Sequence, residues 1–257
     1  MYGAGRLLNH RITNRAGKYL QRWPEKPKIM MFGPPNVPVN KLSQRLAVDL
    51  GVPVVSIKQE YEKVQKYAGK SEEYDHPFFH KVKEILDSGD KDTIQKEKLG
   101  LKLLRISEYA QEGFILSDFP NSIPDAESLE EIDGGMNAFL HVNMPELLLA
   151  QMESVKYQCE DWDAIYWRED VHDEETGASQ ESNYPEDGFC HDCGSSHIKP
   201  AIDPEAFDDD LQKYNDKKDE ILEFYNYLGL LVDVDLKKGG LGDYEGMKQK
   251  LQYGIKF

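Results

Sequence analysis

The chain has 257 residues, of which 39% are hydrophobic, and this suits one sizeable folded domain with a small insertion. No stretch approaches the roughly 20 mainly apolar residues that a membrane helix needs. The longest apolar runs, such as residues 29–32, have the length of a strand. We therefore expect a soluble globular protein that does not span a membrane.

The charges are distributed unevenly along the chain. Residues 1–28 hold seven basic residues and one acidic residue, a net charge of +6, whereas the remainder holds 24 basic and 46 acidic residues, a net charge of −22. We assign residues 1–27 to a basic N-terminal extension. Because it is rich in Arg and poor in acid, it resembles a mitochondrial targeting segment, and the alternative is a solvated basic tail. We expect a protein partner, since so acidic a body disfavours nucleic acid.

Short β-rich runs alternate with helical patterns, which indicates an α/β fold with a parallel sheet. The first two runs enclose a helix that ends at Gly51, and residues 64–112 show the pattern of several helices. The five predicted strands are 28–32, 53–57, 113–117, 138–143 and 230–234.

Residues 159–207 differ in composition from the rest of the domain over residues 28–257. From Glu160 to Asp187 there are eleven acidic residues, and Arg168 is the only basic one. Gly177 and Pro185 interrupt any periodicity. We interpret this segment as an acidic inserted loop or lid, with helical patterning resuming near Asp209.

Two segments carry a resemblance to a known family. Residues 29–50 have the order strand, loop, helix, and residues 113–120 read Gly-Phe-Ile-Leu-Ser-Asp-Phe-Pro. Together with the inserted segment they resemble adenylate kinase over roughly residues 27–255. The second segment is similar to that family's Gly-Phe-Leu-Leu-Asp-Gly-Phe-Pro-Arg motif. The resemblance implies a P-loop-kinase-like, five-stranded parallel sheet flanked by helices, with a lid insertion.

The phosphate-binding loop departs from the family pattern. In the family, the first strand enters a glycine-rich loop whose N–H groups cradle phosphates and whose lysine neutralises them. Gly33 matches, but Asn36 and Pro38 stand at the later glycine positions and Val39 at the lysine position. Pro38 has no N–H, and Val39 has no charge. Lys41 lies two residues further on and would leave the helix from a different face.

Other positions that match the family's functional residues have also changed. Phosphoryl transfer depends on positioned positive charge and on metal. The family's arginines match Glu62, Asn121, Gln151 or Met152, Val155 and Ala206, with Lys156 as the neighbouring cation. The acidic residue near magnesium matches Ser117, with Asp118 shifted by one, and the base-reading glutamine matches Asp125. We therefore expect no catalytic residues and no bound cofactor.

A possible metal site lies in the inserted segment. Cys190 and Cys193 have the spacing of a zinc knuckle, with His197 following, and resemble half of the zinc site in some adenylate kinase lids. We consider a possible structural zinc on Cys190, Cys193 and His197, against unliganded thiols. Further ligands available to complete such a site are Cys159, His172, His191 and Asp203.

An aromatic cluster at Tyr157, Trp162, Tyr166 and Trp167 accompanies the acidic residues. It is interpreted either as packing at the base of the lid or as a docking surface.

The leading functional hypothesis is a pseudoenzyme. It would be a non-catalytic, adenylate-kinase-like structural subunit of a larger, mitochondrial, respiratory-chain assembly, with protein subunits as its partners. A cytoplasmic or ciliary scaffold is the alternative location. Two other functions stay open. One is a divergent nucleoside monophosphate kinase that uses Lys41, Lys58 and Lys156, and the other is a nucleotide sensor without turnover.

Overall fold

The structure is a computed structural model that describes residues 26–56, 83–84, 87, 113–117, 119–131, 135–162 and 164–254. The basic N-terminal extension, except its last two residues, lies outside these ranges. So do most of the helices predicted between residues 64 and 112.

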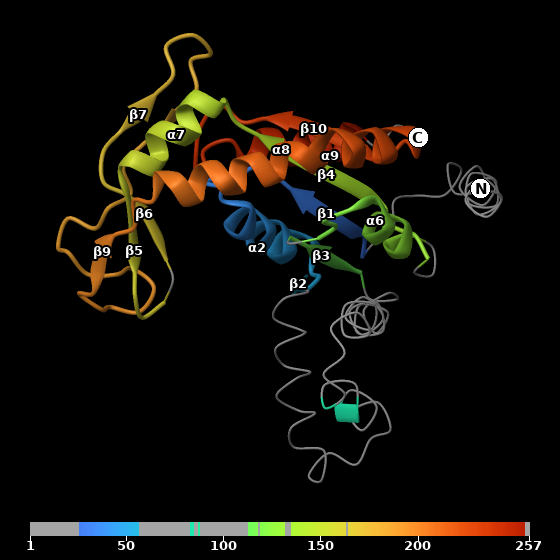
Figure 1. Cartoon of the computed structure of the whole chain (residues 1–257), viewed down its shortest axis with the longest axis horizontal. Coiled ribbons are helices and arrows are strands. Elements are labelled where there is room, and N and C mark those ends of the chain that lie inside the picture. Colours follow the sequence, from blue (N-terminus) through green and yellow to red (C-terminus); the bar gives the residue numbers. More distant parts are fainter. Residues whose placement is uncertain are drawn as a thin grey trace.

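Five parallel strands form the central sheet, in the spatial order β10-β4-β1-β3-β2 (Figure 1). β1 occupies the centre, where Ile29 pairs with Ile115 on one side and with Ala138 on the other. All five predicted strands are present, which confirms the expected P-loop-kinase-like α/β fold. Their bounds are β1 Lys28–Phe32, β2 Val54–Val55, β3 Phe114–Leu116, β4 Ala138–Asn143 and β10 Leu231–Asp235.

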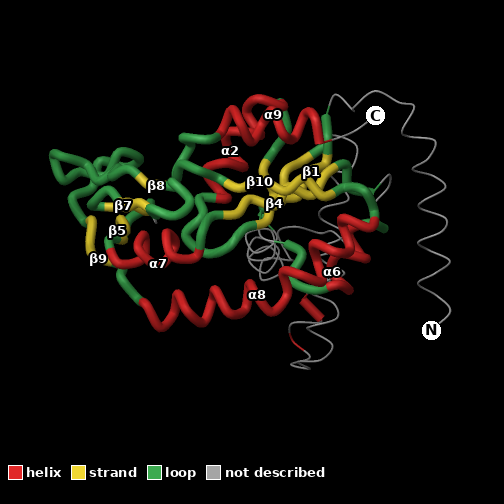
Figure 2. Tube along the Cα trace, turned by 90° about the horizontal axis from the view of Figure 1, so that it is seen from above, coloured by secondary structure: helices red, strands yellow, loops and turns green. Residues whose placement is uncertain are grey.

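Helices cover both faces of this sheet (Figure 2). All five residues of β1 are buried, as expected for a parallel strand between two helical layers. Ile29 and Met31 pack in one hydrophobic cluster with α2, α7 and α9, whereas Met30 and Phe32 pack in a second cluster with α6 and α8. The helices are α2 Val39–Leu50, α6 Ile123–Leu129, α7 Glu146–Ser154, α8 Pro204–Tyr227 and α9 Tyr244–Gly254.

Two helix ends show how the local sequence sets the boundaries. α2 ends at Gly51, whose φ of 64° suits glycine and whose N–H donates to the carbonyl of Ala47, as predicted. α8 begins at Pro204 and not near Asp209, because Asp203 accepts the N–H of Ala206 and proline suits the first helical turn. Within the described ranges, we find no helix that combines the length and the apolar character needed to cross a bilayer.

Residues 156–203, which we call the insertion, form two small antiparallel sheets. β5 Lys156–Cys159 lies between β6 Ile165–Trp167 and β9 Ile198–Pro200, and β7 Val171–His172 pairs with β8 Ser179–Gln180. The segment interpreted as an acidic loop thus has its own strands. They contain only two to four residues each, too few to produce a visible alternation of polar and apolar residues.

Candidate functional site

A cleft of about 1090 Å³ lies beyond the carboxyl ends of β1 and β3, where open parallel sheets usually bind ligands. On the sheet side it is lined by residues 33–41, Ser117 and the Phe119–Pro120 pair, whose peptide bond is cis. On the opposite side it is lined by side chains of the insertion, including Trp162 and Trp167. The cleft therefore lies between the phosphate-loop segment and the insertion.

The loop from Gly33 to Pro38 offers few hydrogen-bond donors to a ligand. Half of its residues are prolines, which have no N–H. The N–H of Val37 donates to the carbonyl of Pro34 at 3.3 Å, inside the loop itself. At most the N–H groups of Gly33 and Asn36 remain within the loop to meet a phosphate. A phosphate-binding loop presents a series of such groups.

Val39, at the position of the family's lysine, lines the cleft and packs partly against the protein interior. A Cβ atom added to Gly33 would lie 2.7 Å from the carbonyl oxygen of Val142 and 3.1 Å from Cγ2 of Val39. Val39 packs, partly buried, against the core cluster of β1 and α2. Its N–H donates to the carbonyl of Val37 at 2.7 Å. This position therefore supplies neither a charge nor a free donor to the cleft.

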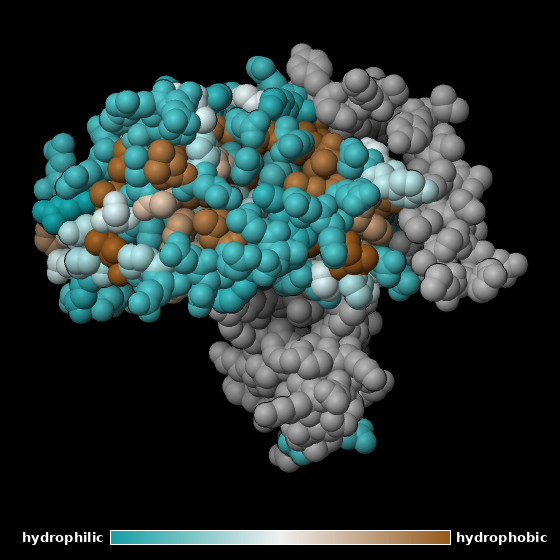
Figure 3. Space-filling view, turned by 45° about the horizontal axis from the view of Figure 1, so that its top comes forward, coloured by the Kyte–Doolittle hydropathy of each residue, from teal (hydrophilic) through white to brown (hydrophobic). Residues whose placement is uncertain are grey.

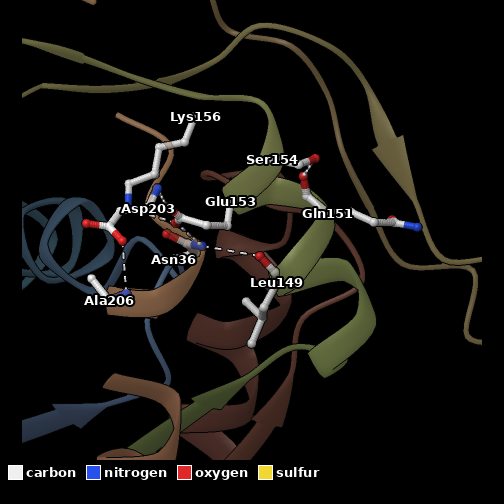
Figure 4. Close-up of polar contacts among 8 residues, drawn as sticks. All are labelled: Asn36, Leu149, Gln151, Glu153, Ser154, Lys156, Asp203 and Ala206. Atoms are coloured by element: carbon white, nitrogen blue, oxygen red, sulfur yellow. Dashed lines mark hydrogen bonds and ion pairs between the residues drawn. The ribbon is translucent and has the colours of Figure 1, made fainter. Parts of the chain in front are cut away.

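A buried carboxylate fastens the loop to α7 (Figure 4). Glu153 is 2% exposed and accepts hydrogen bonds from the side-chain amide of Asn36 at 3.0 Å, from Lys156 Nζ at 2.9 Å and from the N–H of Asp203 at 2.9 Å. The same amide donates to the carbonyl of Leu149 at 3.2 Å. Asn36 has a φ of 68°, which asparagine tolerates better than most residues. The cation nearest the family's arginine positions, Lys156, is thus neutralised by an internal anion.

Other cations line the cleft from α2 and α8. Lys41 and Arg45 belong to the first two turns of α2. Lys217 of α8 donates to the Oδ1 atom of Asn121 at 2.8 Å, and its Nζ lies 5.9 Å from the ring centre of Phe32. Burial lowers the pKa of Lys217. The sequence analysis missed this residue, because only the fold brings α8 to the cleft.

Two further positions that match functional residues of the family have structural roles. The carboxylate of Asp125 accepts the N–H of Asn121 at 3.1 Å, and the N–H of Asp125 donates to the capping hydroxyl of Ser122 at the start of α6. Val155 packs, partly buried, against the core. The residues that lie outside the described ranges are Lys58, Glu62 and Asp118.

Three thiols gather in the insertion. The Sγ atoms of Cys159, Cys190 and Cys193 lie within 4.8 Å of one another, and those of Cys159 and Cys193 are 3.6 Å apart. Tetrahedral zinc, with Zn–S bonds of about 2.3 Å, separates its sulfur ligands by about 3.8 Å, so the spacing fits this ion. The structure thus joins Cys159 to the predicted cysteine pair. It places His197 elsewhere, with Nδ1 at 2.9 Å from Oδ2 of Asp161.

The surroundings of Cys190 favour its thiolate. Burial acts to raise the pKa of this thiol. Hydrogen bonds from the hydroxyl of Tyr166 and from the N–H groups of Cys193 and Asp192 outweigh that effect and lower the pKa to about 7. Metal-binding cysteines need the deprotonated form. These donors therefore favour the form of Cys190 that binds a metal. At Cys193 the effect is opposite, because a hydrogen bond from Ser195 is outweighed by burial and by the thiols of Cys190 and Cys159, which raise the pKa to about 11.

The aromatic cluster divides into buried and exposed members. Tyr166 and Trp167 are buried, which supports the packing interpretation for these two. The hydroxyl of Tyr157 accepts a hydrogen bond from Arg168 at 2.7 Å, and the guanidinium lies over its ring. Trp162 is 63% exposed and borders the cleft, so it is the member that a docking partner could reach.

A polar trio beside the cleft, in which His141 and Tyr214 are buried and Asp233 is exposed, had no signal in the sequence. His141 of β4 bonds through Nδ1 to Asp233 of β10 at 2.7 Å and through Nε2 to the hydroxyl of Tyr214 of α8 at 2.5 Å. The ring of Tyr214 stacks on Phe32 at the end of β1. Burial lowers the pKa of His141, although Asp233 opposes this shift. The trio joins three elements of the core through one side chain.

These features define a class of protein. A five-stranded parallel sheet with helices on both faces, a loop between β1 and α2, and a cleft closed by an insertion make up a P-loop-kinase-like α/β protein. No protein-family model matches the chain.

Comparison with individual proteins shows which proteins of this class the chain resembles. The chain is 24% identical to the adenylate kinase of Methanosarcina barkeri, over 80% of this chain and 90% of that protein. It is 23% identical to the adenylate kinase of Archaeoglobus fulgidus, over 87% and 95% of the two chains. It is 25% identical to that of Lachnoclostridium phytofermentans, over 85% and 94%. The chain is related to the adenylate kinase family.

Proposed function

We propose that this chain is a non-catalytic relative of the adenylate kinases, whose fold serves as a structural subunit of a larger protein assembly. The observation that carries the proposal is the loop from Gly33 to Pro38, in which three residues are prolines and the N–H of Val37 is bonded inside the loop, so that few donors face a ligand. With Val39 at the lysine position, the loop also lacks the cation that neutralises a phosphate in the family. Catalysis of phosphoryl transfer comes almost entirely from such positioned donors and charges. We therefore expect neither turnover nor a nucleotide cofactor.

The buried carboxylate of Glu153 supports the same proposal. It neutralises Lys156 and holds Asn36, so a cation and a loop residue that could face a phosphate are both engaged internally.

The surface supports a role in binding other proteins. The face shown in Figure 3 is mostly hydrophilic, with separate hydrophobic patches between charged side chains. Exposed aromatic and aliphatic side chains of this kind can anchor partners. Among the described residues, the large hydrophobic side chains exposed to solvent are Val48, Leu147, Trp162, Phe189, Ile202, Tyr227 and Leu241.

The proposed location is the mitochondrion, in an assembly of the respiratory chain. The support is the basic, acid-poor segment over residues 1–27, which has the composition of a mitochondrial targeting segment. Cell fractionation and native-gel electrophoresis test this placement. Co-migration with a mitochondrial complex is expected. A free species near 29.5 kDa would refute the assembly, and recovery in the cytosol or in cilia would favour the alternative locations.

We also propose that Cys159, Cys190 and Cys193 hold a structural zinc ion in the insertion. These residues come from β5 and from the knuckle before β9, so the ion would join the two segments of chain. Zinc would stabilise the fold of the insertion and supply no chemistry to the cleft.

A divergent kinase is the competing function. It is favoured by the relatives, since proteins named adenylate kinases match this chain over nearly their whole length. It is also favoured by Lys41 and Lys217, which line the cleft. Binding of ATP or AMP without turnover would make the chain a sensor instead.

Calorimetric titration with ATP, AMP and Mg²⁺, beside a coupled assay of ADP formation, separates the three functions. We expect no binding at millimolar nucleotide and no turnover. Turnover would establish the kinase and refute the proposal, and binding alone would establish the sensor. The matched variant is Pro38→Gly/Val39→Lys, which restores a donor and a cation to the loop. A gain of nucleotide binding in this variant would show that the loop is what prevents binding.

A further inference from the structure

The insertion is joined to the rest of the molecule at a place other than its two ends. The hairpin β7–β8 contacts the loop that follows β10. The N–H of Ser179 donates to the carbonyl of Lys237, and the N–H of Gly239 donates to the carbonyl of Ser179, both at 2.8 Å. Ser179 and Lys238 form an isolated parallel bridge. The backbone of β8 is therefore held on both its donor and its acceptor side.

The loop that receives β8 is itself fixed to the core. The N–H of Leu236 donates to the carbonyl of Asn143 in β4 at 2.8 Å. The carboxylate of Asp243 accepts the N–H groups of Lys237 and Lys238. β8 is thus attached to a loop that cannot move independently of the parallel sheet.

Hydrogen bonds within the hairpin also fix the turn between β7 and β8. Asp173, 4% exposed, accepts the N–H of Glu175 at 3.0 Å and the hydroxyl of Thr176 at 2.6 Å. The carbonyl of Thr176 accepts a hydrogen bond from Lys237 Nζ at 3.1 Å. These contacts close the turn between β7 and β8 and add a third link to the loop after β10.

Hydrophobic packing joins the same surfaces. Ala178 is fully buried, and with Trp167 it belongs to the core cluster that contains Ile29 of β1. β7 and β8 pack beside α7 (Figure 2). A Cβ atom added to Gly239 would lie 1.8 Å from Oε1 of Gln180, so the side chain of Gln180 in β8 packs directly against this loop. The insertion therefore shares the hydrophobic core of the sheet.

We infer that the hairpin β7–β8 locks the insertion to the core, so that it does not swing as a lid over the cleft. Kinase lids close on their substrates by rotating about hinges. Rotation here would break the two backbone hydrogen bonds of β8 and expose Ala178. Each of these hydrogen bonds favours the attached hairpin over the detached one by about fivefold, and the burial of Ala178 favours it further. The inference does not rest on the proposed function, because it concerns only the attachment of the insertion.

Amide hydrogen exchange, resolved by NMR for single residues, tests the lock in the full chain. We expect the amides of Ser179 and Gly239 to exchange within about tenfold of the amide of Leu236, because residues that open together share one protection factor. Exchange of both amides about a thousandfold faster than that of Leu236 would overturn the inference.

The variant Ala178→Glu places a carboxylate at a buried position and should release the hairpin. Exchange at Ser179 and Gly239 should then rise at least about a hundredfold, with Leu236 unchanged. The control Glu175→Gln, at the exposed turn, should leave all three amides unchanged. Unchanged exchange in Ala178→Glu would overturn the inference.

A second measurement uses the unaltered core and does not depend on the folding of that variant. A donor and an acceptor dye are attached through noncanonical residues at the exposed positions of Glu127 and Glu186. In single molecules the transfer efficiency should form one narrow population without nucleotide, and it should not change when millimolar ATP, AMP and Mg²⁺ are added. A change in transfer would show a moving lid and overturn the inference. Turnover without such a change would refute the proposed function and leave the lock standing.

Discussion

Replacing Glu153 by Gln tests whether its carboxylate stabilises the junction between the loop, α7 and the insertion. The side chain is 3% exposed and receives three hydrogen bonds. Removing one partner of a buried ion pair costs about 3–5 kcal/mol. Lys156 is 23% exposed, so its ammonium can turn toward water, and we expect a smaller loss of about 2–3 kcal/mol in the free energy of unfolding.

Guanidinium unfolding of the wild type, Glu153→Gln and an exposed control, Glu223→Gln, measures this loss. The control should stay within about 0.5 kcal/mol of the wild type. The variant Lys156→Met, alone and combined with Glu153→Gln, gives the coupling between the two charges, which we expect to exceed about 1 kcal/mol. A Glu153→Gln variant as stable as the wild type would show that the carboxylate does not hold the junction.

Three further predictions follow from the core and the thiols. Because burial lowers the pKa of His141, the unfolded chain binds its proton more tightly, so stability should fall as the pH drops below about 6.5. His141→Phe should flatten this dependence between pH 7 and pH 5, and an unchanged slope in unfolding curves would contradict the assignment. Gly246→Ala, in open space in α9, should stabilise the chain by about 0.5–1 kcal/mol in denaturant unfolding, whereas Gly33→Ala should destabilise it by about 2 kcal/mol. If the two glycine variants had similar denaturant midpoints of unfolding, the close contact at Gly33 would be refuted. Cys159→Ser should abolish the binding of zinc, measured by mass spectrometry of metals, whereas His197→Ala should still bind zinc. Loss of zinc in His197→Ala would show that the histidine is a ligand after all.

The sequence predicted the layers of the fold because their signals are local. The β1 run and the helix ending at Gly51 each show a periodicity or a stop residue within a few positions. The start of α8 was placed too late. Its acidic first turns hide the helical pattern, although Asp203 followed by Pro204 is a typical cap.

The candidate site was only partly predictable, because its decisive contacts join residues far apart in the chain. The changed residues of the loop, such as Val39, could be recognised from their spacing alone. Glu153 gave no signal, since its bond to Asn36 spans 117 residues and depends on where α7 packs. Cys159 was one of several possible partners for the later thiols, and only the pairing of β5 with β9 brings it beside them.

The proline-rich loop bears on how the stability of this protein in the cell depends on nucleotides. A ligand that binds only the folded state stabilises it in proportion to the logarithm of the ligand concentration. An enzyme with a nucleotide site therefore resists unfolding and proteolysis more strongly when its nucleotide is abundant. In this chain the loop closes through the Val37–Pro34 hydrogen bond and the tether of Asn36. If the chain binds no nucleotide, as proposed, the amount of folded protein would not depend on the nucleotide concentration in the cell.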